Sequence, residues 1–329
     1  MKGVIERCNR TVLETLESGT LREAKIAAES FRNGGKRLRP ALMILSSMVP
    51  GGKSIDEADD KLIDLAAAVE LIHLATLFHD DVIDEVDNRR TNLSARIKYG
   101  NYVAVLAGDY VLAEALLLVN RSGLTQTMPE FLRTIRVLVR GESRETTHKF
   151  DFDISEAVYR EIISEKSASL FSLACKVGAM SQNSEYVDVI GHFGWNLGMA
   201  FQMIDDLDDM IELPNGTMDC DLKNGYLALP MIRALRTLED GHRDNLVEII
   251  RRGEFTPADE QQIVAACRDH GGIEYAHHEI LAHLNQAGHT LERFDDTESR
   301  GYLEMIIRDL KAYTDAQLTD FVKFDAASA

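Results

Sequence analysis

Proline is scarce in this chain, and its distribution constrains the fold more than any other feature. The six prolines among 329 residues leave long uninterrupted stretches between Pro50 and Pro129, between Pro129 and Pro214, and after Pro257. These stretches are rich in Ala, Leu, Glu, Arg and Ile, which favour helices, whereas a proline inside a helix disrupts its hydrogen bonding. The chain is therefore predicted to be mostly helical.

Apolar residues recur along these stretches with the 3.6-residue period of an α-helix. Helices are expected in the segment ALPMIRALRTL and over residues 4–32 (one helix or two), 41–49, 57–84, 93–118, 128–147, 155–180, 187–211, 241–252, 257–270, 272–295 and 298–323. AVLAGDYVLAEALLLV, within 93–118, is nearly all apolar and is expected to be buried. No linker rich in Pro, Gly or Ser divides the chain. Residues 1–329 are thus predicted to form one all-α domain, a helical bundle surrounding a central elongated cavity.

The net charge of −18 argues against nucleic acid as a partner. It would also repel an anionic substrate, so any phosphate site must be built locally from metal ions and a few placed Lys and Arg side chains. The four cysteines are scattered and predict a reducing compartment. The start, MKGVIERCNRTVLETL, does not resemble a signal peptide, and no stretch of 18 apolar residues occurs. We therefore expect a cytoplasmic protein with no membrane span.

Two aspartate clusters of the form Asp-Asp-x-x-Asp follow long apolar runs. They consist of Asp80, Asp81 and Asp84 in LFHDDVID and of Asp205, Asp206 and Asp209 in FQMIDDLDD. Residues four apart share a helical face, and the segments DNRRTN and LPNG place each cluster near the C-terminal end of its helix. Negative charge is unfavourable there because of the helix dipole and like-charge repulsion, so a bound cation is expected.

Oxygen ligands alone indicate a hard cation, and Mg²⁺ held by one or two carboxylates usually shares its shell with substrate phosphates. The alternative is a pair of solvated acidic helix ends. Two clusters of identical spacing, both preceded by apolar residues, make that alternative the poorer explanation. The sequence therefore predicts a magnesium-dependent diphosphate site.

Cationic residues that could hold phosphate occur at two places. In NGGKRLRP, Gly35, Lys36 and Arg39 belong to a glycine turn on which backbone amides and side chains could converge, although a solvated basic loop is the alternative. Arg89 and Arg90 follow the first aspartates and offer bidentate phosphate contacts, or else salt bridges to nearby acids.

Isolated polar residues also interrupt apolar helical faces. His73 lies two turns before Asp80 on the same face, where a satisfied core histidine is the alternative. Lys166 and Ser167 occur in SEKSASLF, where the lysine could reach a polar pocket or extend to solvent. Gln202 lies on the Asp205 face, and its amide suits orientation of a ligand or cation.

Taken together, these motifs closely resemble those of the trans-isoprenyl diphosphate synthases (polyprenyl synthetases). The resemblance extends from about Gly34 to Leu235 and includes ELIHLATLFHDDVIDEVDNRR, GDYVLAEA, EKSASLF, FQMIDD and DLKNGYLALP. It implies an isoprenoid synthase fold and the condensation of isopentenyl diphosphate with an allylic diphosphate. The same resemblance implies a homodimer.

The resemblance also implies the roles of the site residues. The six aspartates would bind three Mg²⁺ ions that bridge to the allylic diphosphate and promote its departure. Lys166, Ser167 and Gln202 would orient that diphosphate and shield the allylic carbocation, and Arg89 would contact it. Isopentenyl diphosphate would be held by Lys36, Arg39, His73 and Arg90, with Gly35 and Arg37 shaping the loop.

Three departures from the family pattern stand out. Ser167 replaces the usual threonine, and Thr91 follows the arginine pair where glycine is usual. In GTMDCDLKNGYLALP, Cys220 and Tyr226 stand where lysines are common, and Lys223 could substitute for them. This last departure bears on the strength of allylic diphosphate binding.

Product length is predicted from Ala75 and Thr76, which lie about one turn before Asp80. Both are small, so an elongating chain could pass, as in the long-chain branch of the family. Larger residues further along could instead close the channel and give a farnesyl or geranylgeranyl product. A terpene cyclase and a subunit of a two-component synthase are further alternatives. The basic turn and Arg90 argue against the cyclase, and two complete aspartate clusters argue against a non-catalytic subunit.

Overall fold

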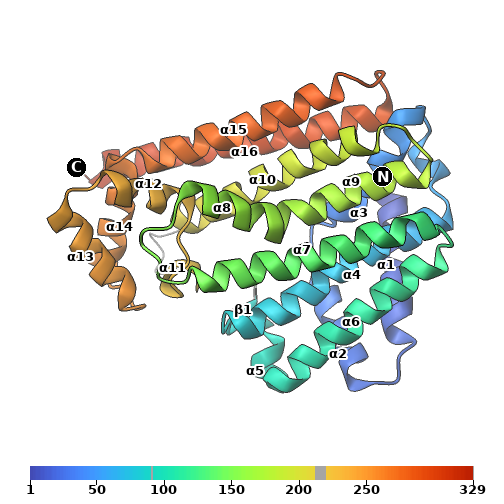
Figure 1. Cartoon of the computed structure of the whole chain (residues 1–329), viewed down its shortest axis with the longest axis horizontal. Helices are drawn as coiled ribbons and strands as arrows, with labels where there is room; N and C mark the ends of the chain where they lie inside the picture. The colour runs from blue at the N-terminus through green and yellow to red at the C-terminus, as the bar shows by residue number, and fades with distance from the viewer. Residues whose placement is uncertain (90–91, 212–219, 329) are drawn as a thin grey trace. The chain divides into compact units, whose positions relative to one another are not determined.

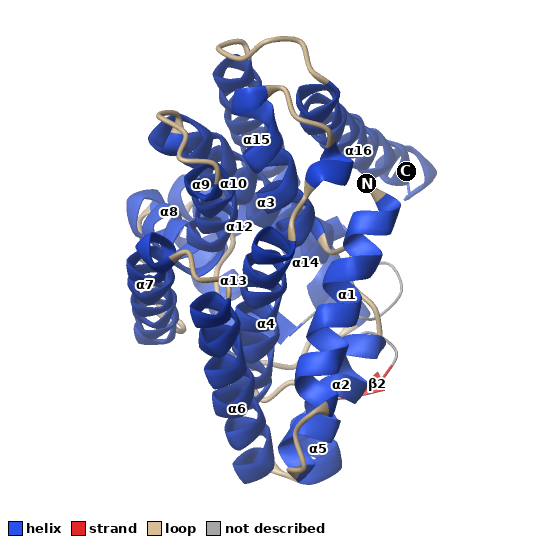
Figure 2. Cartoon of the chain, turned by 90° about the vertical axis from the view of Figure 1, so that its right-hand side faces the viewer, coloured by secondary structure: helices blue, strands red, loops and turns tan. Residues whose placement is uncertain are grey.

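The computed structural model describes residues 1–89, 92–211 and 220–328, and most of these residues are helical (Figures 1 and 2). The α-helices are α1 (Lys2–Glu17), α2 (Arg22–Arg32), α3 (Leu38–Met48), α4 (Asp60–Ile83), α5 (Ala95–Tyr99), α6 (Asn101–Arg121), α7 (Met128–Thr147), α8 (Glu156–Ile163), α9 (Ser169–Ser181), α10 (Val187–Ile211), α11 (Cys220–Lys223), α12 (Leu229–Thr237), α13 (Asp240–Arg251), α14 (Pro257–Asp269), α15 (Gly272–Leu291) and α16 (Glu298–Ser328). Two short strands, β1 (Asn88–Arg89) and β2 (Asn92–Leu93), form an antiparallel pair. The prediction of an all-α fold is confirmed.

One compact unit comprises residues 1–136, 170–194 and 290–303. Its central helix is α4, which packs against α1, α3 and α6. Leu65, Val69 and Leu71 of α4 are fully buried, as expected for a helix that is apolar on all sides. Gly108 of α6 allows a close approach, because a Cβ atom there would lie only 2.3 Å from the His79 ring of α4.

The second compact unit comprises residues 137–169, 195–289 and 304–329. In this unit α12 packs against α8 and α14, and α13 packs against α11 and α14. Ile232 and Leu235 of α12 are buried, together with Ile263 of α14. The prediction that residues 1–329 form a single domain stays a prediction.

Two expectations about the helices need correction. Residues 93–118 are not one helix, because Gly100 adopts a φ of +88° that ends α5 before α6 begins. The expectation that AVLAGDYVLAEALLLV is buried throughout is also wrong. Val105 is 38 % exposed and Leu117 is 59 % exposed, so only one face of α6 is covered within this chain.

Two helices, α4 and α6, are long and apolar enough to cross a membrane by length and composition alone. In α4, 72 % of the most apolar window is buried within the protein, as in the core helix of a soluble protein, whereas in α6 the share is 39 %. The expectation of no membrane span therefore remains a prediction.

Candidate functional site

The second aspartate cluster occupies the last two turns of α10, as the sequence predicts. Asp205 is exposed, whereas Asp206 and Asp209 are half-buried. The Asp206 carboxylate accepts hydrogen bonds from the Tyr159 hydroxyl at 2.5 Å and from Nε2 of Gln202 at 2.8 Å. Burial raises the pKa of the Asp206 carboxyl, and these two hydrogen bonds oppose that rise. Asp206 is therefore held in a fixed orientation by neutral donors.

These residues border a pocket that lies within the second unit. Lys166, Ser167, Gln202, Asp206 and Asp209 all line it, so five of the predicted residues converge on one cavity. The Ser167 hydroxyl donates a hydrogen bond to Oε1 of Gln202, whose amide nitrogen in turn donates to Asp206. The remaining lining is partly apolar and includes Ile162, Ile163, Leu227 and Met231. The pocket thus combines a polar wall with apolar surface.

Lys166 and Ser167 lie in a π-helical turn, η4 (Ser164–Ala168), inserted between α8 and α9. Sequence periodicity predicts one helix over 155–180 and does not reveal this turn. Such turns occur mostly as single insertions in α-helices, frequently at functional sites, because the extra residue re-aims the side chains around it. Here Lys166 and Ser167 of the insertion both line the pocket.

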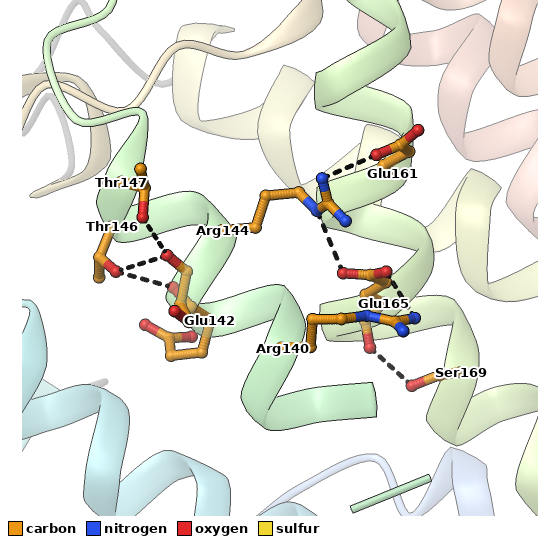
Figure 3. A network of polar contacts seen from close by, with 9 residues as sticks. Arg140, Glu142, Arg144, Thr146, Thr147, Glu161, Glu165 and Ser169 are labelled. Carbon is orange, nitrogen blue, oxygen red and sulfur yellow. Dashed lines mark hydrogen bonds and ion pairs between the residues drawn. The ribbon is translucent and has the colours of Figure 1, made fainter. Parts of the chain in front are cut away.

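An ion-pair network holds this turn against α7 (Figure 3). Glu165, which is 9 % exposed, accepts from Arg140 at 2.7 Å and from Arg144 at 3.3 Å, and Arg144 also pairs with Glu161 at 2.9 Å. The close approach of α7 to the π-helical turn requires glycine at 141, since a Cβ atom there would lie 2.7 Å from the Lys166 backbone nitrogen.

The Lys166 ammonium is paired with two carboxylates of α7. It lies 3.0 Å from Glu142 and forms a short contact with Glu145. Burial raises the pKa of Glu145 to about 8, and Lys166 opposes the rise. Sequence reasoning missed Glu142, Glu145 and Tyr159. The two glutamates are three residues apart and so share a helical face, which is only a weak indication that they act together. Nothing in the sequence indicated a role for Tyr159.

Asp208 has a different role from its neighbours in the second cluster. Both of its carboxylate oxygens lie 2.9 Å from the Tyr313 hydroxyl, and Gln317 donates to it as well. Asp208 therefore ties α10 to α16. The predicted metal set, which follows the Asp-Asp-x-x-Asp spacing, does not include it.

The first aspartate cluster belongs to the other unit and lies at the end of α4, again as predicted. The Asp84 backbone amide donates a hydrogen bond to the Asp80 carbonyl at 2.8 Å, which completes the last helical turn. Asp80 is half-buried, whereas Asp81 and Asp84 are 3 % and 9 % exposed. The stacking of Asp80 and Asp84 on one face follows from the intact helical turn.

The glycine turn lies in the same unit. Gly34 and Gly35 have φ values of 110° and 139°, and Arg37 has a φ of 51° just before α3. Arg37 donates to Asn9, to Glu70 at 3.0 Å and to the Phe31 carbonyl at 2.8 Å. This side chain therefore shapes the loop, as the family resemblance implies.

The other predicted residues of the first unit take varied positions. Lys36 is exposed on the turn, and the Arg39 guanidinium stacks 4.7 Å from the centroid of the Phe171 ring. His73 and Thr76 are half-buried on α4, and Ala75 is 2 % exposed.

Two arginines and one lysine complete the predicted set. Arg89 belongs to strand β1, whereas Arg90 lies outside the described residues, as does Thr91. Lys223 ends the short helix α11 in the second unit and is half-buried.

The described carboxylates do not form a ready-made metal cage. Within residues 1–89, 92–211 and 220–328, no group of three or more His, Cys, Asp or Glu side chains is placed to hold an ion. The donors that are present are nevertheless carboxylate oxygens, the type that Mg²⁺ prefers. Mg²⁺ commonly uses one or two carboxylates and completes its shell with substrate phosphate and water. The donor chemistry therefore fits Mg²⁺ bound together with a diphosphate.

Comparison with known proteins gives a consistent result. The family model for polyprenyl synthetase matches residues 23–267. A short chain isoprenyl diphosphate synthase of Methanothermobacter thermautotrophicus is 30 % identical over 286 residues, which cover 83 % of this chain and 85 % of that protein. A nonaprenyl diphosphate synthase of Mycobacterium tuberculosis is 34 % identical over 315 residues, which cover 90 % of this chain and 89 % of that protein.

A solved structure is similar over almost the whole chain. It is that of a polyprenyl synthase from Caulobacter crescentus complexed with calcium and isoprenyl diphosphate. Its TM-score is 0.86 with 29 % identity, and the match covers 94 % of each chain.

Proposed function

The chain belongs to the polyprenyl synthetase family and is a prenyltransferase, and from this premise we propose that it is a long-chain trans-polyprenyl diphosphate synthase. Its substrates are isopentenyl diphosphate and an allylic diphosphate. The observation that carries the proposal is the convergence of Lys166, Ser167, Gln202, Asp206 and Asp209 on one pocket.

The reaction begins with cleavage of the allylic carbon–oxygen bond, and the electron pair leaves with the diphosphate. The double bond of isopentenyl diphosphate then attacks the allylic cation, and loss of a proton to the released diphosphate regenerates an allylic product. Charge that develops on a leaving group is best stabilised by cations and dipoles already in position. Lys166, held by Glu142 and Glu145, places its ammonium in this pocket, and the hydrogen-bonded Ser167 and Gln202 offer oriented dipoles.

Asp80, Asp81, Asp84, Asp205, Asp206 and Asp209 are the proposed metal ligands. They would hold Mg²⁺, three ions in this proposal, which would supply positive charge to neutralise the diphosphate and favour its departure. Asp206 already accepts hydrogen bonds from Tyr159 and Gln202, so its carboxylate is oriented before any ion arrives. The Asp205 carboxylate is exposed and accessible to solvent cations.

Isopentenyl diphosphate is assigned to the first unit, with Gly35, Lys36, Arg39, His73 and Arg90 as its binding residues. The geometry of the turn supports this assignment. Arg37 turns inward and fixes the backbone, while Lys36 remains exposed on a segment with positive φ values at 34, 35 and 37. Arg89 is assigned to the allylic diphosphate and Lys223 to the same group as a replacement cation.

The long-chain product rests on the small side chains at Ala75 and Thr76. The Thr76 hydroxyl donates to the His73 carbonyl at 2.9 Å, so this polar group is satisfied within its own helix. The relatives carry both short-chain and nonaprenyl names, so a farnesyl or geranylgeranyl product is the second candidate.

A direct assay tests the proposal. The purified protein is incubated with farnesyl diphosphate, isopentenyl diphosphate and Mg²⁺, and the products are separated by chain length. Polyprenyl diphosphates longer than geranylgeranyl are expected. Products that stop at farnesyl or geranylgeranyl length would favour the second candidate. An absence of any condensation product would refute the proposed activity or indicate that a partner subunit is required.

We also propose a cytoplasmic homodimer. Tyr102, Val105 and Leu117 leave an apolar face of α6 exposed in the single chain, which a second copy could cover. Cys8, Cys175 and Cys267 are buried free thiols, consistent with a reducing compartment. Analytical ultracentrifugation at micromolar concentration tests the dimer, and a monomer would contradict it.

A further inference from the structure

The charge balance of the pocket poses a problem for an anionic substrate. Among the described residues that line it, Glu145, Asp206, Asp209 and Asp221 are acidic. Lys166 lines the same pocket but is already paired with Glu142 and Glu145. Bound metal ions would offset part of this negative charge, but the lining side chains themselves bring four carboxylates against one lysine. A further cation near the wall would favour binding of a diphosphate.

Lys149 is placed to supply that charge. Its ammonium lies 5.3 Å from the centroid of the Tyr226 ring, and Tyr226 lines the pocket. The distance is within the range of a cation–π contact, which keeps the amine beside the wall without neutralising it. Lys149 is exposed, and it forms no ion pair with any carboxylate of the described chain.

The backbone around Lys149 is fixed to the loop that carries Tyr226. The Phe150 amide donates to the Gly225 carbonyl at 2.8 Å. Phe150 has a φ of +58° and Gly225 a φ of +84°, and a Cβ atom at 225 would lie 2.5 Å from the Phe150 ring. The two segments therefore meet at one defined point, which sets the position of Lys149 relative to Tyr226.

We propose that Lys149, seated on Tyr226, forms a cationic rim that binds the diphosphate group of the allylic substrate. This inference rests on the proposed function and deepens it. It assigns the charge to the turn that follows α7, whereas the sequence suggested Lys223 as the replacement for lysines absent at Cys220 and Tyr226. In this proposal the Tyr226 ring holds the Lys149 ammonium by a cation–π contact, at a position where lysine is common in the family.

Steady-state kinetics test the assignment. Lys149→Ala is expected to raise KM for farnesyl diphosphate about tenfold, as for loss of one charge-assisted phosphate contact. KM for isopentenyl diphosphate should change little. Lys149→Arg should retain most of the affinity. Tyr226→Leu, which removes the ring, should resemble Lys149→Ala, while Tyr226→Phe should remain close to the unsubstituted protein.

A lysine of the other unit provides the control. Lys25→Ala removes an exposed charge on α2, in the other unit, and should leave both KM values unchanged. An unchanged farnesyl diphosphate KM in Lys149→Ala would overturn the proposal. So would an equal effect of Lys149→Ala on both substrates.

A binding measurement separates this inference from the proposed activity. Inorganic diphosphate with Mg²⁺ is titrated calorimetrically into the unsubstituted protein and into Lys149→Ala. A roughly tenfold weaker Kd in the variant is expected even if no condensation is detected. Equal affinities, or no binding to the unsubstituted protein, would refute the rim. Because Lys149 is exposed, both proteins should show the same Tm.

Discussion

Replacement of Gly141 by alanine should displace the π-helical turn that carries Lys166 and Ser167. A Cβ atom at 141 would lie 2.7 Å from the Lys166 backbone nitrogen and 2.8 Å from Cβ of Glu165. The first distance is about 0.7 Å less than the 3.4 Å at which ordinary van der Waals contact begins. The nearest atom belongs to backbone, so the turn itself must move by several tenths of an ångström.

The expected effect on stability is modest because two terms oppose each other. Overpacking costs about 1–3 kcal/mol, whereas alanine in a helix is favoured over glycine by about 1 kcal/mol. The net loss in the free energy of unfolding should therefore be about 0–2 kcal/mol. Activity should suffer more, because misplacement of catalytic groups by about 1 Å can reduce turnover about a hundredfold.

Chemical unfolding and steady-state kinetics together test this reasoning. Gly288→Ala is the matched control, since Gly288 also lies within a helix of the second unit and a Cβ atom there would meet nothing within 4 Å. The control should be neutral or slightly stabilised and fully active. Normal turnover by a folded Gly141→Ala variant would show that the position of the π-helical turn does not limit catalysis.

Three other substitutions test the remaining assignments. Asp205→Ala should slow turnover by several orders of magnitude with the fold intact, and chelation of Mg²⁺ should abolish activity; full turnover in EDTA would eliminate the metal hypothesis. Lys36→Ala should raise KM for isopentenyl diphosphate about 10- to 150-fold, for a contact of about 1.5–3 kcal/mol, and an equal rise for the allylic substrate would mean that the two sites are misassigned. Ala75→Phe should shorten the product to about farnesyl or geranylgeranyl length, as measured by chromatography, and an unchanged distribution would place the channel elsewhere.

Local patterns in the sequence were sufficient for much of the helical organisation. Residues 128–147 and 187–211 form α7 and α10 with the predicted bounds, because apolar periodicity and flanking turn residues act over a few positions. The placement of both aspartate clusters at helix ends followed from the same short-range signals. The acidic clusters, the basic turn and the family resemblance also led to the correct enzyme class.

Other features depend on contacts between residues distant in the chain, and only the tertiary structure decided them. Periodicity could not reveal the π-helical turn, whose position against α7 depends on the close approach at Gly141 and on the pairing of Glu165 with Arg140 and Arg144. Periodicity also could not show that one face of α6 is exposed, because the apolar residues of a helix do not reveal which other helices pack against it.

The cationic rim illustrates the same limit. In the sequence, Lys149 is an ordinary charged residue that follows a predicted helix, and Tyr226 stands where lysine is common in the family. They meet because the backbone of Phe150 is hydrogen-bonded to Gly225, a contact across 75 positions that no local pattern encodes. The residue types that the chemistry needs can be recognised in the sequence. The residues that each of them contacts are determined only by the folded structure.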